Sequence, residues 1–216
     1  MHLKRSEMPK AWPVPRKGTA YIARADHAKD ISMPLVFIIR DVLKLANTKK
    51  EARILLLNGD VKVNNRVRKS EKFPLSVFDT VSFEKIGKSY KLVIKNKKFK
   101  LEEVSGKEAD QKIVTVVGKK ILLNKKIQIN LEDGTNYLFG KEFALGDSAV
   151  VNTKKNEIEA ILPLKKGAKV EIVSGKHAGE TGKVEEVITL AREKKYKIKL
   201  KNKEVELPVK TLLVIE

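Results

Sequence analysis

Apolar residues first recur at helical spacing between Leu35 and Leu43, three or four positions apart, and this predicts one helix. Pro34 suits its first turn. A second helix begins at Thr48, because Glu51 three residues later completes a capping box. Asn58 and Gly59 end it. The expected inner face is Ala52, Leu55 and Leu56, and the expected basic face is Lys49, Lys50 and Arg53.

The pattern changes to short strands directly after Gly59. VKV and RVRK flank Asn64 and Asn65, two residues that tolerate the positive φ of a tight hairpin turn. Residues 80–83 complete the unit, although the alternation gives no single apolar face. Two helices beside a basic hairpin predict a shallow surface suited to a folded RNA backbone.

Strand-like alternation continues from residue 96 to 164, in FKLEEV, KIVTVVG, KKILLNKKIQINL, TNYLF and DSAVVN. An Asp133-Gly134 turn separates two of these runs. We expect a small β domain here. It either spaces and supports the RNA-binding ends of the chain or touches RNA itself.

The last segment has two strand patterns, AKVEIV and GKVEEV, joined by the glycine-rich loop SGKHAGET. Lys176 and Lys183 are placed to meet phosphate, and Gly182 is expected to occupy a tight turn. A Walker A loop is excluded, because His177 stands where glycine is required and Val184 follows the lysine. YKIKLKNKEVEL predicts a closing hairpin and LLVIE a final strand.

The N-terminal segment, residues 1–33, contains three prolines in its first fifteen residues, which disfavour helix and sheet. We expect an extended arm that is mobile until RNA orders it. Its cations are candidate phosphate contacts: Lys4, Arg5, Lys10, Arg16 and Lys17. Trp12 either stacks on a base or packs on the first domain.

Composition supports a polyanionic partner. Lys and Arg number 46 against 27 Asp and Glu, a net charge of +19, with a pI near 9.9. The chain has no cysteine, and its three histidines lack metal-ligand spacing, so no metal or cofactor is expected. No apolar run approaches the ~20 residues of a membrane span, so we expect a soluble, cytosolic protein. Three aspartates are expected to close turns rather than catalyse: Asp79, Asp133 and Asp147.

Several stretches resemble known motifs. EARILLLNGDVKVNN followed by FDTVSF resembles the αL RNA-binding motif of ribosomal proteins, pseudouridine synthases and some tRNA synthetases, with Asn65 where that motif usually has glycine. Residues 165–187 are similar to a KOW motif, found in an SH3-like barrel. With HLKR, AWPVPRKG, PLVFIIRDVLKLA and VRKSEKFPLSVFDTVSF in order, nearly the whole chain resembles the e-type small-subunit ribosomal protein four family of archaea and eukaryotes, and its short C-terminus resembles the archaeal form.

This resemblance implies an α+β, mostly β protein with four modules: a basic extended arm (1–33), an αL-type RNA-binding domain (34–95), a central β domain (96–164) and a KOW SH3-like domain (165–216). It implies a non-catalytic constituent of the cytoplasmic small ribosomal subunit, bound to small-subunit rRNA and neighbouring ribosomal proteins, with no small-molecule substrate. The expected RNA-binding residues are those named above together with Arg40, Lys62, Arg66, Arg68 and Lys69. Two alternatives stay open: the RNA-targeting module of an RNA-modifying enzyme, and a KOW-type transcription elongation factor.

Overall fold

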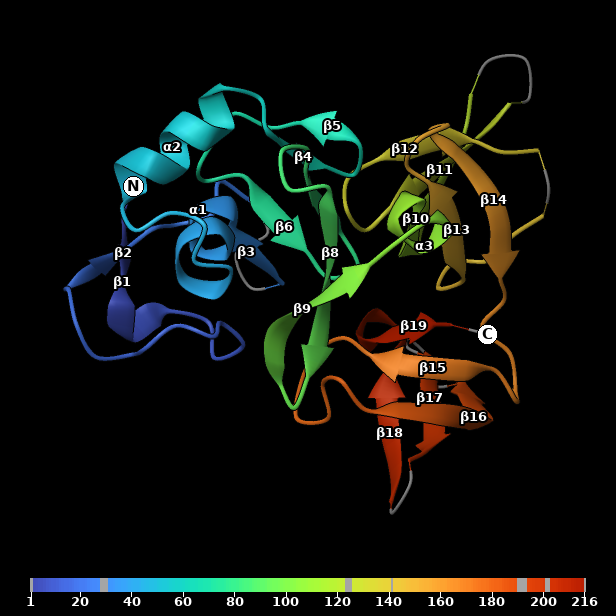
Figure 1. Cartoon of the computed structure of the whole chain (residues 1–216). Helices are drawn as coiled ribbons and strands as arrows, with labels where there is room; N and C mark the ends of the chain where they lie inside the picture. The colour runs from blue at the N-terminus through green and yellow to red at the C-terminus, as the bar shows by residue number, and fades with distance from the viewer. Residues whose placement is uncertain are drawn as a thin grey trace. The chain divides into compact units, whose positions relative to one another are not determined.

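The structure is a computed structural model that describes residues 2–27, 31–122, 126–140, 142–189, 194–200 and 203–215. It contains two compact units, Met1–Asp110 and Gln111–Glu216, and both are built mostly from strands (Figure 1). Parts of four predicted segments lie outside the described residues: 1 and 28–30 of the arm, 123–125 of KKILLNKKIQINL, 201–202 of the closing hairpin, and 216 of the final strand.

A five-stranded antiparallel sheet with the order β5-β4-β7-β8-β9 organises the first unit. Its strands are β4 (Val61–Val63), β5 (Arg66–Val67), β7 (Thr80–Phe83), β8 (Lys88–Lys95) and β9 (Lys98–Val104). Two short strand pairs lie outside it: β1 (Leu3–Lys4) with β2 (Tyr21–Ile22), and β3 (Ser32–Pro34) with β6 (Pro74–Ser76). The helical segments are η1 (Arg5–Glu7), α1 (Leu35–Phe37), η2 (Ile38–Val42), α2 (Lys49–Leu57) and α3 (Lys107–Asp110).

The first predicted helix is shorter and less regular than its apolar spacing indicates. Only Leu35–Phe37 is α-helical, and the next turn, Ile38–Val42, is a π-helix in which Leu43 N donates to Ile38 O at 2.9 Å. Lys44 then takes a positive φ of 54°, which ends the helix. Leu35 through Ile39 are all buried, including Val36 and Phe37 between the predicted stripe positions, whereas Val42 and Leu43 of the stripe are only half-buried.

The boundary expected between residues 95 and 96 falls inside a hairpin. β8 pairs with β9 along seven residue pairs, from Ser89↔Val104 to Lys95↔Lys98. Asn96 and Lys97 form the turn, with φ values of 53° and 64°. FKLEEV therefore belongs to the sheet of the first unit and not to the central β domain.

The N-terminal segment is folded onto the first unit, which corrects the prediction of an extended, mobile arm. β1 and β2 pair with each other, and Phe99 N donates to Ala11 O at 2.8 Å. Five apolar side chains of the segment are buried: Leu3, Met8, Trp12, Ala25 and Met33. Their spacing is irregular, so no helix or strand periodicity revealed them, but long-range packing gives them a core to enter.

The second unit contains two five-stranded antiparallel sheets. The first has the order β12-β11-β10-β13-β14 and comprises β10 (Gln111–Ile121), β11 (Ile127–Leu131), β12 (Asn136–Leu138), β13 (Ser148–Asn152) and β14 (Glu157–Leu162). The second, named here the C-terminal sheet, has the order β18-β17-β16-β15-β19. It comprises β15 (Lys169–Ile172), β16 (Thr181–Thr189), β17 (Lys194–Lys199), β18 (Glu204–Pro208) and β19 (Leu212–Val214), with η4 (Val209–Thr211) before the last strand.

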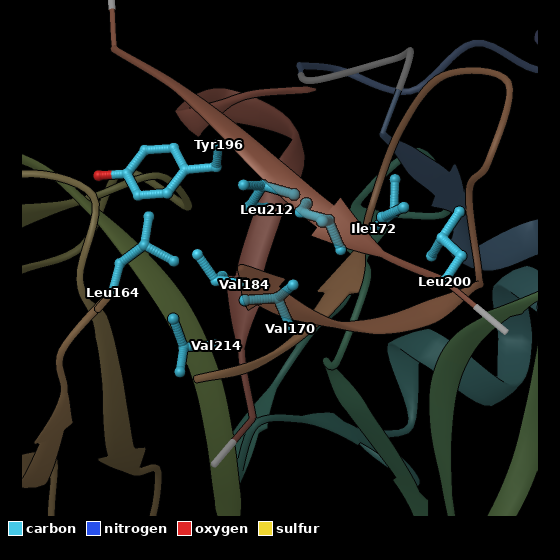
Figure 2. Close-up of a cluster of buried hydrophobic side chains, with 9 residues drawn as sticks. Leu164, Val170, Ile172, Val184, Tyr196, Leu200, Leu212 and Val214 are labelled. Carbon is cyan, nitrogen blue, oxygen red and sulfur yellow. The ribbon is translucent and has the colours of Figure 1, made fainter. Parts of the chain in front are cut away.

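Alternate residues of the C-terminal sheet form an apolar core. Figure 2 shows side chains from separate strands of this sheet, Val170, Val184 and Leu212 among them, gathered in one cluster with Leu164 and Tyr196. The two sheets of this unit are also linked by a hydrogen bond from Val214 N to Ser148 Oγ at 2.8 Å. Strand alternation thus leaves the other face of the C-terminal sheet to its polar residues.

Gly182 lies within β16 and not in a turn, which corrects its predicted role. It pairs with Val170 of β15, and its φ is not in the positive region. A Cβ at this position would lie 2.6 Å from Ile198 Cγ2 and 2.7 Å from the Lys199 carbonyl oxygen. Glycine is therefore required for close approach of strands, while the loop before it turns at Gly175 and Gly179, with φ values of 95° and 85°.

Candidate RNA interface

The start of α2 is fixed by the predicted capping box. Thr48 Oγ1 accepts a hydrogen bond from Glu51 N at 3.2 Å, and the Glu51 carboxylate accepts from Asn47 N at 2.8 Å and from Thr48 Oγ1 at 3.0 Å. The bonds from Asn47 N and Thr48 lower the pKa of Glu51. The cap is confirmed, and it fixes the start of α2, the helix that carries Lys49, Lys50 and Arg53.

The end of α2 and the following hairpin are also confirmed. Gly59 has a φ of 83°, and Asn64 and Asn65 have φ values of 49° and 62°, which a two-residue hairpin turn requires. Asn64 Nδ2 donates to Asp79 Oδ1 at 2.8 Å, and Asn64 Oδ1 accepts from Thr80 N at 3.0 Å. Asparagine thus supplies the left-handed backbone and also ties the turn to β7.

Hydrogen bonds and burial divide the cations of the first unit into two groups. Lys50, Arg53 and Lys69 are exposed and, among the residues the structure describes, have no ion pair. Arg66 is also exposed, on β5. Others have carboxylate partners: Lys49 with Glu71 at 2.9 Å, Lys62 with Glu84, and Arg40 with Asp41 at 2.8 Å. The hydrogen bond to Asp41 raises the pKa of Arg40.

Arg68 differs from the exposed cations because an aromatic ring covers it. Its guanidinium carbon lies 4.4 Å from the centre of the Phe73 ring, and its Nε is buried without a hydrogen bond. A cation–π contact of this kind holds the side chain against the protein. Arg68 is therefore only partly available to RNA in this structure.

Arg5 is a structural residue in this structure, contrary to its predicted role as a phosphate contact. Its Nε donates to Thr19 O and its Nη2 to Thr19 Oγ1, both at 2.8 Å, and its Nη1 donates to Pro15 O. These bonds close the loop between β1 and β2. Four cations of this segment remain exposed: Lys4, Lys10, Arg16 and Lys17.

The predicted role of Trp12 in RNA binding is also corrected. The indole is only 2% exposed, its Nε1 donates to Ser32 O at 2.8 Å, and its ring centre lies 5.2 Å from that of Phe37. Of the two alternatives for Trp12, packing on the first domain is therefore correct, and the ring has no exposed face on which a base could stack. Tyr21, which the sequence analysis passed over, is 58% exposed and lies opposite Lys4 in the β1–β2 pair, with the His2 ring 5.0 Å away.

The glycine-rich loop between β15 and β16 presents Lys176 to solvent, while His177 Nδ1 lies 3.3 Å from the Glu180 carboxylate. Lys183 is exposed two residues inside β16. The structure therefore places these two lysines on different elements, one in the loop and one on the strand.

The aspartates considered as catalytic groups all stabilise local structure. Asp79 Oδ2 accepts from Ser76 N at 2.7 Å, and Asp147 accepts from Ala144 N and Leu164 N. Asp133 pairs with buried Lys112 at 2.6 Å. Burial acts to raise the pKa of Asp133, but the Lys112 charge and hydrogen bonds outweigh it, so the pKa is lowered.

The described residues contain no group of three or more His, Cys, Asp and Glu that could hold a metal. None of their helices is long and apolar enough to cross a membrane.

Two known sequence families match parts of this chain and indicate its class of protein. The sequence profile described as ribosomal family S4e matches residues 86–158, and the KOW motif matches residues 166–189, which span β15, the glycine-rich loop and β16. The first of these two matches is to a family of ribosomal proteins.

Full-length relatives give the family. Small ribosomal subunit protein eS4 of Methanosphaera stadtmanae is 35% identical over 86% of this chain and 79% of its own length, and that of Pyrobaculum islandicum is 33% identical over 94% and 90%. The crystal structure of 30S ribosomal protein S4e from Thermoplasma acidophilum matches with a TM-score of 0.74 and 26% identity over 87% of this chain and 96% of that one. The chain belongs to the small ribosomal subunit protein eS4 family.

Proposed function

We propose that this protein is a non-catalytic constituent of the small ribosomal subunit that binds rRNA there, next to other ribosomal proteins. Family membership supports this role, and the aspartates that could have served catalysis are engaged in turns and strand ends. Binding of this kind requires exposed positive charge held on a folded surface and no reacting group.

We assign the principal rRNA surface to the αL-type part of the first unit, namely α2, the β4–β5 hairpin and the residues directly after it. The observation that carries this assignment is the exposure of Lys50, Arg53 and Lys69 without carboxylate partners among the described residues, beside a capped helix and a fixed hairpin. The first unit holds 25 Lys and Arg against 13 Asp and Glu, a charge of +12 (25 minus 13) out of the total +19. The exposed cations of the N-terminal segment extend this surface, and the KOW SH3-like barrel of residues 165–216 adds further contacts.

The experiment is a salt titration of rRNA binding. Each phosphate contact contributes about 0.7 to 0.9 to the slope of log Kobs against log salt. We expect the variant K50Q/R53Q/K69Q to lose about two units of slope when it binds small-subunit rRNA. A matched control is K85Q/K88Q/K95Q, which removes the same formal charge from lysines paired with Asp60, Glu103 and Glu102. Equal slopes for the two variants would show that net charge, and not this surface, sets the affinity.

We assign base stacking in this segment to the exposed Tyr21 in place of the buried Trp12. Stacking is not a counterion effect, so Tyr21→Ala should weaken rRNA binding about 5- to 100-fold while the salt slope stays the same. Tyr21→Phe keeps the ring and should bind like the parent. A changed slope with Tyr21→Ala, or full affinity, would remove Tyr21 from the interface.

A further inference from the structure

The middle of the chain carries none of the positive excess found elsewhere. Residues 127–164 contain three lysines against six Asp and Glu, a net charge of −3 (3 minus 6), so the rest of the chain carries +22 (19 plus 3). The four strands of this stretch, β11 to β14, contain no Lys or Arg. Because binding to a phosphate backbone depends on positive charge, these strands are poorly suited to contact RNA.

β14 forms one edge of the sheet β12-β11-β10-β13-β14 and pairs only with β13 (Figure 1). Proteins usually protect such an edge with lysine, with proline or by keeping the strand very short. Among the described edge strands of more than three residues, β9 contains Lys98 and Lys100, and β18 ends at Pro208. The six residues of β14 include neither lysine nor proline. This edge is therefore open to a further strand.

A single bulge interrupts the pairing of β14. The register with β13 shifts by one residue at Glu159. The Glu159 carboxylate accepts hydrogen bonds from Gln111 Nε2 of β10 and Asn152 Nδ2 of β13, both at 2.7 Å. These bonds hold the carboxylate over the face of its own sheet and not out from the edge. Residues 160–162 then continue in regular register with β13.

The side chains of β14 combine negative charge with partly covered apolar surface. Glu157 is exposed and has no ion pair within the part of the chain that the structure describes. Ile158 and Ile161 are half-buried and pack against the core of the sheet. An added strand would bond to the free main chain of β14 and cover the remaining surface of these isoleucines.

We propose that the outer edge of β14 is a protein-docking site that receives an extended segment of a neighbouring ribosomal protein, with basic side chains beside Glu157 and apolar ones beside Ile158 and Ile161. This inference rests on the proposed function, since it names a kind of partner within the small subunit. Charge complementarity favours a basic segment. A second copy of this chain suits the site less well, because two chains of +19 repel each other.

The first test adds positive charge to the edge in the full chain. E157K/A160K raises the net charge by three, and both positions are exposed. The matched control, T181K/E186K, makes the same change at exposed positions of β16, a strand that is paired on both sides. Small subunits are reconstituted from rRNA and the other small-subunit proteins, with the parent or a variant of this chain.

Like charges at a docking contact oppose binding, so E157K/A160K should enter the particles at least about 10-fold more weakly than the control. Both variants should bind naked rRNA equally well, because the edge does not contact RNA. Equal entry into the particles would reject the docking site. A loss by E157K/A160K that is just as large with naked rRNA would assign the edge to RNA and would also overturn the inference.

A photo-crosslinking residue at position 160 identifies the contact directly and keeps Glu157. In particles reconstituted with this variant, we expect a product that resists ribonuclease and whose linked peptide contains Lys or Arg. A product with RNA, a product with a second copy of this chain, a linked peptide without basic residues, or no product would each overturn the inference. If E157K/A160K melts early, the crosslink decides alone. If the parent neither binds rRNA nor enters the particles, it is the proposed function that fails.

Discussion

Trp12 offers the sharpest test of how the N-terminal segment is held, because it is the only tryptophan in the chain. Its ring is buried against Phe37, and its indole N–H is bonded to Ser32 O. Replacing a buried tryptophan by alanine costs about 3 to 5 kcal/mol through lost burial and the remaining cavity. A typical domain has a free energy of unfolding of about 5 to 15 kcal/mol, so Trp12→Ala should remove a large part of it.

A graded variant separates the ring from its hydrogen bond. Trp12→Phe keeps an aromatic ring near Phe37 but removes the donor to Ser32 O, which should cost about 0.5 to 1.5 kcal/mol for the bond and somewhat more for the smaller volume. Tyr21→Ala is the matched control, because Tyr21 is in the same segment and is 58% exposed. It should change the free energy of unfolding by less than about 0.5 kcal/mol.

Urea unfolding followed by far-ultraviolet circular dichroism measures these differences without relying on the tryptophan itself. In the parent, emission of Trp12 should be blue-shifted and shielded from acrylamide before any RNA is added. Limited proteolysis should leave Lys10 to Lys17 uncut under conditions that preserve α2. If acrylamide quenches Trp12 as it quenches free tryptophan, or if Trp12→Ala unfolds at the parent's urea midpoint, the segment is not docked in the free protein.

Three further predictions concern stability. Gly182→Ala should destabilise the protein by about 1 to 3 kcal/mol in urea unfolding, because its Cβ would lie 2.7 Å from a backbone oxygen of the neighbouring strand; parent-like stability would show that the strands can separate freely. Thr48→Ala should cost about 1 kcal/mol by loss of the N-cap while Thr48→Ser stays near the parent, and equal values for the two would contradict the cap. The pKa of Asp133 is lowered in the folded state, so the stabilisation that its carboxylate provides is present above about pH 4 and is lost as the pH falls through the folded pKa. Asp133→Asn should abolish that part of the acid dependence, because it removes the ion pair with the buried Lys112.

Local patterns were enough to predict the start and end of α2 and the hairpin turn that follows it. The capping box at Thr48, the glycine at the end of α2 and the Asn64-Asn65 turn each act within a few residues, and each is confirmed by a hydrogen bond or a positive φ. The 95/96 boundary could also have been corrected from sequence, because Asn96 between two strand patterns is the same kind of turn signal as Asn64. What the pattern lacked was any indication of which sheet a strand joins, since pairing is a long-range property.

The errors elsewhere have a common physical cause. Prolines predicted that the N-terminal segment would not form regular helix or sheet of its own, but they say nothing about whether isolated apolar residues find a core formed by other segments. Glycine at position 182 has two physical uses, a positive φ and the absence of a Cβ, and the sequence does not distinguish them. In both cases the deciding contacts are made with residues distant in sequence, Phe37 for Trp12 and Ile198 for Gly182.

Contacts with other parts of the chain also decide which basic side chains are available to bind RNA. Lysines and arginines look alike in sequence, yet Arg5 closes a loop, Arg68 packs against an aromatic ring and Lys112 neutralises the half-buried Asp133. These three are used within the fold, so removing them should lower stability first. Lys50 and Lys183 are exposed without carboxylate partners among the described residues, so the fold gains little from their charge and bears some repulsion from it. Measuring both the free energy of unfolding and the salt slope of rRNA binding for each variant therefore identifies the RNA surface more directly than net charge does. Only the exposed lysines contribute to binding through released counterions.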